Sequence, residues 1–178
     1  KCSTPGGMWG TDEFGYGLFS SANIYHTFKI VWSLVGGGMT KYFQEVTATH
    51  CIDIFNTKIA PFLTSKGVTQ TAAVGFCWGA WCGTHIAAAA TLAANVAIHP
   101  SIDAACGAHK EDEEALLRAA AATPTCVFAT FTEPGAWQPG GKSHGVMTAE
   151  AQRLGKAPET HIRWSGPIKQ MHGFVTRG

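Results

Sequence analysis

A cysteine in the middle of the chain lies in a pattern that could make it a nucleophile. Cys77 stands between two glycines, Gly75 and Gly79, in the arrangement G-x-C-x-G. In a nucleophile elbow, such a residue occupies a sharp turn between a strand and a helix. The glycines let the two elements approach closely, and the start of the helix favours a negatively charged thiolate. The pattern therefore predicts a thiolate that attacks carbonyl carbon. An inert cysteine in a tight turn remains the alternative.

The elements that must position this cysteine can be read from the second half of the chain. From residue 68 onward, apolar segments typical of strands alternate with helical patterns. The strands are expected over 68–76, 95–99, 125–131 and 161–165, and the helices over 79–94, 110–122 and 144–154. This alternation predicts an α/β domain with a mostly parallel sheet that helices cover on both faces.

The first third of the chain has a weaker pattern. Residues 1–11 are rich in Gly, Pro and Ser and are expected to be irregular, and a helix is expected to end near Leu34. A longer helix is predicted over 39–64, because apolar residues recur there at helical spacing. Pro61 is expected to kink this helix or to mark its end.

Other residues that could do chemistry follow the ends of the predicted strands. His99, Pro100 and Ser101 follow the second strand, a loop from Thr132 follows the third, and His172 follows the last. The carboxyl ends of parallel strands are where such sheets place their sites. A nucleophile, an acid and a histidine in this chain order are typical of α/β-hydrolases.

Several of these segments together resemble the dienelactone hydrolase family, the carboxymethylenebutenolidase-like α/β-hydrolases. The elbow Gly75-Phe76-Cys77-Trp78-Gly79 and the final segment Met171-His172-Gly173-Phe174-Val175-Thr176-Arg177-Gly178 are the specific matches. The lead Cys2-Ser3-Thr4-Pro5-Gly6, the turn Asp12-Glu13-Phe14-Gly15 and the triplet His99-Pro100-Ser101 agree with the family and keep its order. The resemblance implies one α/β-hydrolase domain over residues 1–178.

The resemblance also implies a catalytic triad. Cys77 would be the nucleophile and His172 its base. The family's acid is an aspartate after the next-to-last strand, and here Glu133 occupies that place. Glutamate is one methylene longer, so Glu133 is the weakest member of the predicted triad. The substrate would be a small ester or lactone, and neither a metal nor a cofactor is needed.

Further positions take supporting roles by the same resemblance. The backbone N–H groups of Trp78 and Glu13 would form an oxyanion hole. Asp12 would contact the resting thiol, and Arg177 could contact an anionic substrate group.

The chain departs from the family in its N-terminal half. Strands expected before Asp12 and after the first helix have no counterpart, which predicts a sheet with exposed apolar edges. Three functions stay open: a cysteine-dependent hydrolase of lactones or activated carboxylic esters, a catalytically inactive structural or interaction subunit of a larger complex, and a redox-sensing thiol protein.

Composition limits the class of protein. Hydrophobic residues make up 46% of the chain and charged residues 14%, and the formal net charge is +1. The sequence has no basic patch of the kind that nucleic-acid-binding proteins carry. No apolar run reaches the ~20 residues of a membrane span. Six cysteines show no metal-ligand spacing, which favours reduced thiols and a cytoplasmic or organellar-matrix protein. Homo-oligomer formation or membership of a larger assembly stays open. Cys82 is interpreted as a packing residue, and the acidic run at 111–114 as a solvated helix start.

Overall fold

The computed structural model describes residues 45–90, 92–130 and 135–168. The chain divides into two compact units, Lys1–Glu45 with Phe174–Gly178, and Val46–Gly173. The described residues belong almost entirely to the second unit, which contains the predicted nucleophile. The expectation of a single domain over residues 1–178 stays a prediction.

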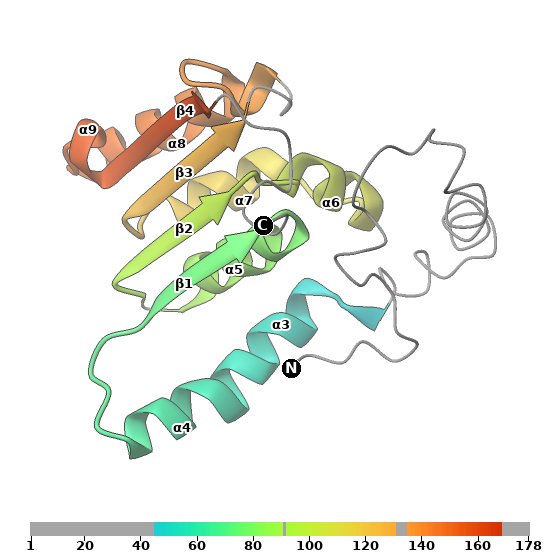
Figure 1. The fold of residues 1–178 in the computed structure, drawn as a ribbon, viewed down its shortest axis with the longest axis vertical. Helices are drawn as coiled ribbons and strands as arrows, with labels where there is room; N and C mark the ends of the chain where they lie inside the picture. Colours follow the sequence, from blue (N-terminus) through green and yellow to red (C-terminus); the bar gives the residue numbers. More distant parts are fainter. Residues whose placement is uncertain (1–44, 91, 131–134, 169–178) are drawn as a thin grey trace, which may run out of the picture. The chain divides into compact units, whose positions relative to one another are not determined.

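Four parallel strands form the sheet of this unit (Figure 1). They are β1 (Ala72–Phe76), β2 (Ala94–Ile98), β3 (Thr125–Thr130) and β4 (Ile162–Ile168). Their order across the sheet, β1-β2-β3-β4, is the same as their order along the chain. The pairing is regular until a shift of register between Phe128 and Thr130, where β3 pairs with β4. The predicted parallel sheet is therefore confirmed for the described part of the chain.

Helices connect the strands. They are α5 (Trp78–Ala89), α6 (Ile102–His109), α7 (Glu113–Ala120), α8 (Lys142–Arg153) and α9 (Pro158–His161), with a short 3₁₀ turn at Gly135–Trp137. The single helix predicted over 110–122 is wrong at its start. Lys110 takes a left-handed conformation (φ 56°) and ends α6, and the Asp112 side chain then caps α7 by accepting from the Ala115 N–H at 3.1 Å.

The helix predicted over 39–64 is interrupted at Val46 and Thr47, and residues 39–44 lie outside the described part of the chain. The helical segment after the interruption consists of α3 (Ala48–Ile54), a π-helical turn (Phe55–Ile59) and α4 (Ala60–Ser65). Thr47 begins it, because its hydroxyl accepts from the His50 N–H at 3.2 Å and caps the helix. Pro61 does not end it. The segment takes π geometry in the turn before Pro61, a proline that has no N–H to donate to an earlier carbonyl.

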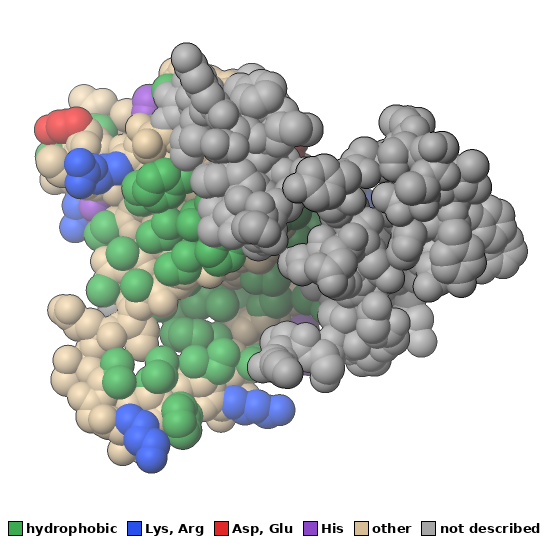
Figure 2. All heavy atoms as spheres, viewed as in Figure 1, with side chains coloured by type: hydrophobic (Ala, Val, Ile, Leu, Met, Phe, Trp, Pro, Cys, Tyr) green, Lys and Arg blue, Asp and Glu red, His purple; other side chains and the backbone are tan. Residues whose placement is uncertain are grey.

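The described helices pack on one face of the sheet. On that face the side chains of Asn95, Ala97 and Val127 are buried, and the backbone of α5 comes close to Asn95 at Gly83. On the opposite face Val74 is 58% exposed and Phe76 36% exposed. Figure 2 shows hydrophobic side chains gathered over the strands on this side. The prediction of helices on both faces is thus confirmed for one face only within the described residues, and the opposite face is the open face of the sheet.

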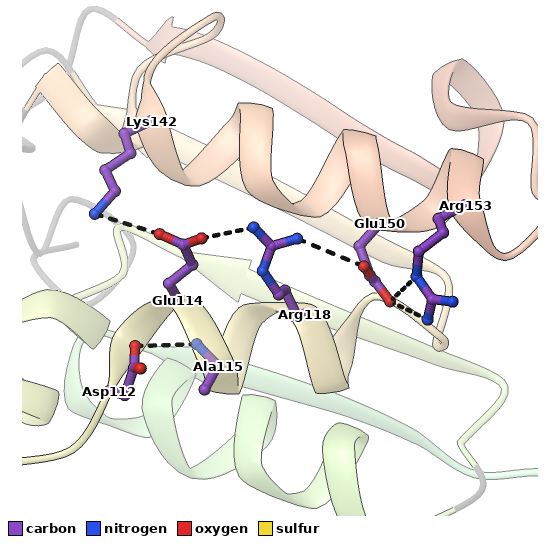
Figure 3. Close-up of polar contacts among 7 residues, drawn as sticks. All are labelled: Asp112, Glu114, Ala115, Arg118, Lys142, Glu150 and Arg153. Atoms are coloured by element: carbon purple, nitrogen blue, oxygen red, sulfur yellow. Dashed lines mark hydrogen bonds and ion pairs between the residues drawn. The ribbon is translucent and has the colours of Figure 1, made fainter.

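Polar contacts join α7 to α8 at the edge of this helical layer (Figure 3). Arg118 of α7 pairs with Glu114 at 2.6 Å and with Glu150 of α8 at 3.6 Å. Arg153 donates two hydrogen bonds to the same Glu150 carboxylate, at 2.9 and 2.6 Å. The carboxylate of Glu150 is therefore shared by two arginines from two helices. Within the described residues, no helix is long and apolar enough to span a membrane.

Candidate active site

The turn between β1 and α5 holds the predicted nucleophile in an unusual backbone conformation. Cys77 has φ 52° and ψ −119°, in a region that side-chain-bearing residues rarely adopt. A Cβ on Gly75 would lie 2.6 Å from the Cα of Ala80 and would also overlap the carbonyl oxygen of Gly79, so only glycine fits at this position. The close approach expected of both glycines is wrong for Gly79, where an added Cβ meets no atom within 4 Å. The predicted strained elbow is present, and Gly75 alone provides its close contact.

Backbone hydrogen bonds fix this elbow to the end of the neighbouring strand. The Cys77 N–H donates to the carbonyl of Ile98, the last residue of β2, at 3.1 Å. The Cys77 carbonyl in turn accepts from the N–H groups of Ser101 at 3.2 Å and Ala80 at 3.1 Å. Three bonds on one residue hold the strained conformation in place, as an observed outlier requires.

The thiol of Cys77 faces the loop that follows β2. Its Sγ lies 3.4 Å from the Oγ of Ser101. His99 of the same loop also has positive φ (38°), and its side chain is buried, with the residue 2% exposed. The backbone N–H of His99 donates to the backbone carbonyl of Phe128 at 2.8 Å. The ends of β1 and β2 thus bring Cys77, His99 and Ser101 to one edge of the sheet, as the sequence predicts.

Trp78 is the first residue of α5, so its backbone N–H lies at the helix terminus that favours negative charge. Its ring packs beside those of Trp81 and His109, with centroids 5.3 and 5.5 Å away. Trp81 is fully buried in the core, which agrees with the interpretation of these tryptophans as wall or core residues. The other predicted site residues lie outside the described residues: Asp12, Glu13, Glu133, His172 and Arg177.

The sequence did not predict a polar cluster between the elbow helix α5 and the segment that connects α6 to α7. The indole N–H of Trp81 donates to Glu111 Oε2 at 2.9 Å, and His85 Nε2 lies 2.9 Å from the same oxygen. The ring of His109 stacks on Trp81 at 4.6 Å. Glu111 therefore belongs to a half-buried polar cluster and not to a solvated helix start.

A second residue of the acidic run also departs from the prediction. Ser143 of α8 donates to Glu113 at 3.0 Å, and burial raises the pKa of this carboxyl group. The prediction of a solvated helix start holds best for Asp112, which is exposed and caps α7.

The thiols of the described residues have different environments. Burial, with help from the charge of Glu111, raises the pKa of Cys106 to about 12. Burial also raises the pKa of Cys126 in β3. Cys82, predicted to be only a packing residue, has its Sγ 3.1 Å from the Sγ of Cys51. Within the described part of the chain, no group of three His, Cys, Asp or Glu side chains is arranged to hold a metal ion.

A groove of about 560 Å³ lies where β1 and β2 begin, at the other end of these strands from Cys77. It is lined by residues that precede β1 and β2, such as Thr71 and Ala93, and by Leu63 of α4. It does not include the elbow, so it does not belong to the candidate active site.

Comparison of the chain with models of protein families, with curated proteins and with solved structures finds no match. The resemblance to dienelactone hydrolases therefore stays a prediction that depends on the motifs themselves. What the described residues establish is a parallel α/β sheet with a cysteine held in a strained strand-to-helix turn.

Proposed function

We propose that this protein is a cysteine-dependent hydrolase of lactones or activated carboxylic esters, with the α/β-hydrolase fold of the dienelactone hydrolase family. The observation that carries the proposal is the backbone of Cys77. A non-glycine residue at φ 52° between a strand and a helix N-terminus is the geometry of a nucleophile elbow. Such strain persists in folded proteins where the surrounding structure holds it, and it concentrates at functional sites.

The topology supports the proposed partners of Cys77. All four strands are parallel, so β3 and β4 end at the edge of the sheet where β1 enters the elbow. Glu133 follows the end of β3 by three residues, and His172 follows the end of β4 by four. Chain order and strand direction are therefore compatible with a Cys77–His172–Glu133 triad.

The chemistry would proceed in two halves. The Cys77 thiolate attacks the carbonyl carbon, and the oxyanion that forms accepts hydrogen bonds from the Trp78 and Glu13 N–H groups. The C–O bond then breaks, and His172 gives its proton to the leaving oxygen. In the second half His172 takes a proton from water, and the resulting hydroxide cleaves the thioester. In the proposed mechanism Glu133 orients His172.

The test is hydrolysis of a small dienelactone and of an aryl ester by the full chain beside Cys77→Ala. The parent should turn over, and the variant should lose at least ~10³-fold in rate. Cys126→Ala is the matched control, since Cys126 lies in β3 with its side chain on the open face. It should keep the parent activity. A covalent acyl adduct on the Cys77 peptide, trapped with a slow ester, would support the thioester step.

A second candidate is a catalytically inactive structural or interaction subunit. One observation favours it, the exposure of Val74 and Phe76 on the open face of the sheet. If parent and Cys77→Ala are both folded and both inactive on either substrate, the hydrolase proposal fails. The subunit then becomes the better candidate.

A further inference from the structure

Two cysteines that the proposed hydrolase chemistry does not use lie in direct contact. Cys51 is on α3 and Cys82 is on α5, and their Sγ atoms are 3.1 Å apart. Both side chains are half-buried and pack against the main core. Among the described cysteines this is the one pair whose sulfur atoms come within hydrogen-bond distance.

The contact brings the two sulfur atoms close to the separation of a disulfide bond. A disulfide requires an S–S distance of about 2.05 Å, so the two sulfurs must approach by only about 1 Å. They lie on two helices that pack together, 31 residues apart in the sequence. A small shift of one helix against the other supplies this movement without breaking either helix.

The two thiols also differ in reactivity. The contact with the Cys82 thiol lowers the pKa of Cys51, whereas the same contact and burial raise the pKa of Cys82. The thiolate is the reactive form of cysteine. In the oxidation proposed below, Cys51 is accordingly assigned the first attack and Cys82 the resolving step.

We propose that Cys51 and Cys82 form a reversible disulfide that fastens α3 to the elbow helix α5, with a hydroperoxide as the oxidant. The Cys51 thiolate attacks one oxygen of hydrogen peroxide, so that an S–O bond forms, the O–O bond breaks and hydroxide leaves. The Cys82 sulfur then attacks Cys51, the S–S bond forms, and the S–O bond breaks with loss of a second hydroxide. The protons of the two thiols convert both hydroxides to water, and two electrons pass from the sulfurs to the peroxide.

The proposed disulfide does not involve the proposed nucleophile, but it closes a loop of the chain that contains it. Cys77 lies within the loop that the disulfide would close, five residues before Cys82. The cross-link would hold α5, and with it the elbow, against α3. The inference does not depend on hydrolase activity, because it concerns two other thiols.

The test treats the reduced full chain with hydrogen peroxide and then counts the remaining thiols by maleimide labelling. Cys51 and Cys82 should lose their label together, and a dithiol reductant should restore both. Chymotryptic peptides should show Cys51 joined to Cys82, because cleavage after Trp78 and Trp81 separates Cys82 from Cys77. Oxidation should raise the midpoint of thermal unfolding by about 5–10 °C.

Matched variants make the test specific. Cys82→Ser and Cys51→Ser should each abolish the cross-link and the shift in the midpoint, while Cys126→Ser keeps both. Cys77→Ala should also keep both, which separates this proposal from the hydrolase proposal. A cross-link that joins Cys77 to Cys82, or a parent that is oxidised at Cys77 while Cys51 and Cys82 stay labelled, would overturn the inference.

Discussion

Replacing Cys77 by glycine should make the protein more stable than replacing it by alanine. The backbone angles at this position, φ 52° and ψ −119°, are strained for any residue with a side chain. Such a sparsely populated conformation costs about 1–3 kcal/mol of folding stability. Glycine avoids this strain and loses about 0.5–1 kcal/mol through its greater freedom in the unfolded chain. The difference leaves Cys77→Gly more stable than Cys77→Ala by about 1 kcal/mol, a factor of ~5 in the folding equilibrium.

The matched control is Ala149→Gly, at an exposed position inside α8. At an ordinary helical site the same change should destabilise the protein by about 1 kcal/mol. The sign of the alanine-to-glycine effect should therefore reverse between positions 149 and 77. Equilibrium unfolding in urea measures both, and unchanged slopes would show that only the stability has changed.

If alanine is also the more stable residue at position 77, by the amount seen at position 149, then Cys77 is not strained in solution. The elbow geometry would then lose its support, and with it the observation on which the proposed function depends.

Three further perturbations test other parts of the structure. Gly75→Ala should destabilise the protein by more than ~2 kcal/mol, because the new Cβ overlaps the backbone of α5. The control is Gly145→Ala in α8, where an added Cβ meets no atom within 4 Å and should stabilise the protein by about 0.5–1 kcal/mol. Thermal unfolding compares the two variants. Asp112→Ala should cost about 1 kcal/mol by removing the cap of α7, and Asp112→Asn should restore most of it in the same denaturation assay. Hydrogen bonds from Arg153 and the nearby Arg118 lower the pKa of Glu150, so its stabilising effect is present above pH 4.5 and is lost as the pH falls through the folded pKa. Glu150→Gln should therefore flatten the acid side of the stability–pH curve, and an unchanged acid limb would contradict the shared-carboxylate interpretation.

The strands and the elbow could be predicted because their signals are local. The segments around Ala72–Phe76, Ala94–Ile98 and Thr125–Thr130 are short apolar runs bounded by turn residues or charged helices. The elbow needs only Gly75 and Cys77 at their spacing, and both behave as the pattern predicts.

The errors in the helices came from signals that compete over a few residues. The acidic run was interpreted as one helix start, but only Asp112 caps a helix, and the left-handed Lys110 separates α6 from α7. Thr47 could have been recognised as a cap, and its signal was missed because the apolar spacing continues across it. Local spacing alone does not decide which of two such signals a chain obeys.

Contacts between distant residues had no sequence signal at all. The pairing of Cys51 with Cys82 depends on how α3 packs on α5. The contact of Trp81 with Glu111 likewise depends on where the segment after α6 lies relative to α5. Glu133 and His172 lie outside the described residues, so the structure describes the backbone turn at Cys77 and the predicted triad stays a prediction.

The strand order of the sheet has a consequence for biosynthesis. Since the order across the sheet repeats the order along the chain, each of β2, β3 and β4 pairs with a strand that has already left the ribosome. None of these four described strands has to be inserted between two that are already paired, and each new pairing is with the strand just before it in the chain. Sheets built from such nearby pairings form faster than those that need distant ones. The described unit can thus assemble in the direction of translation, starting from β1 and the elbow and growing one strand at a time.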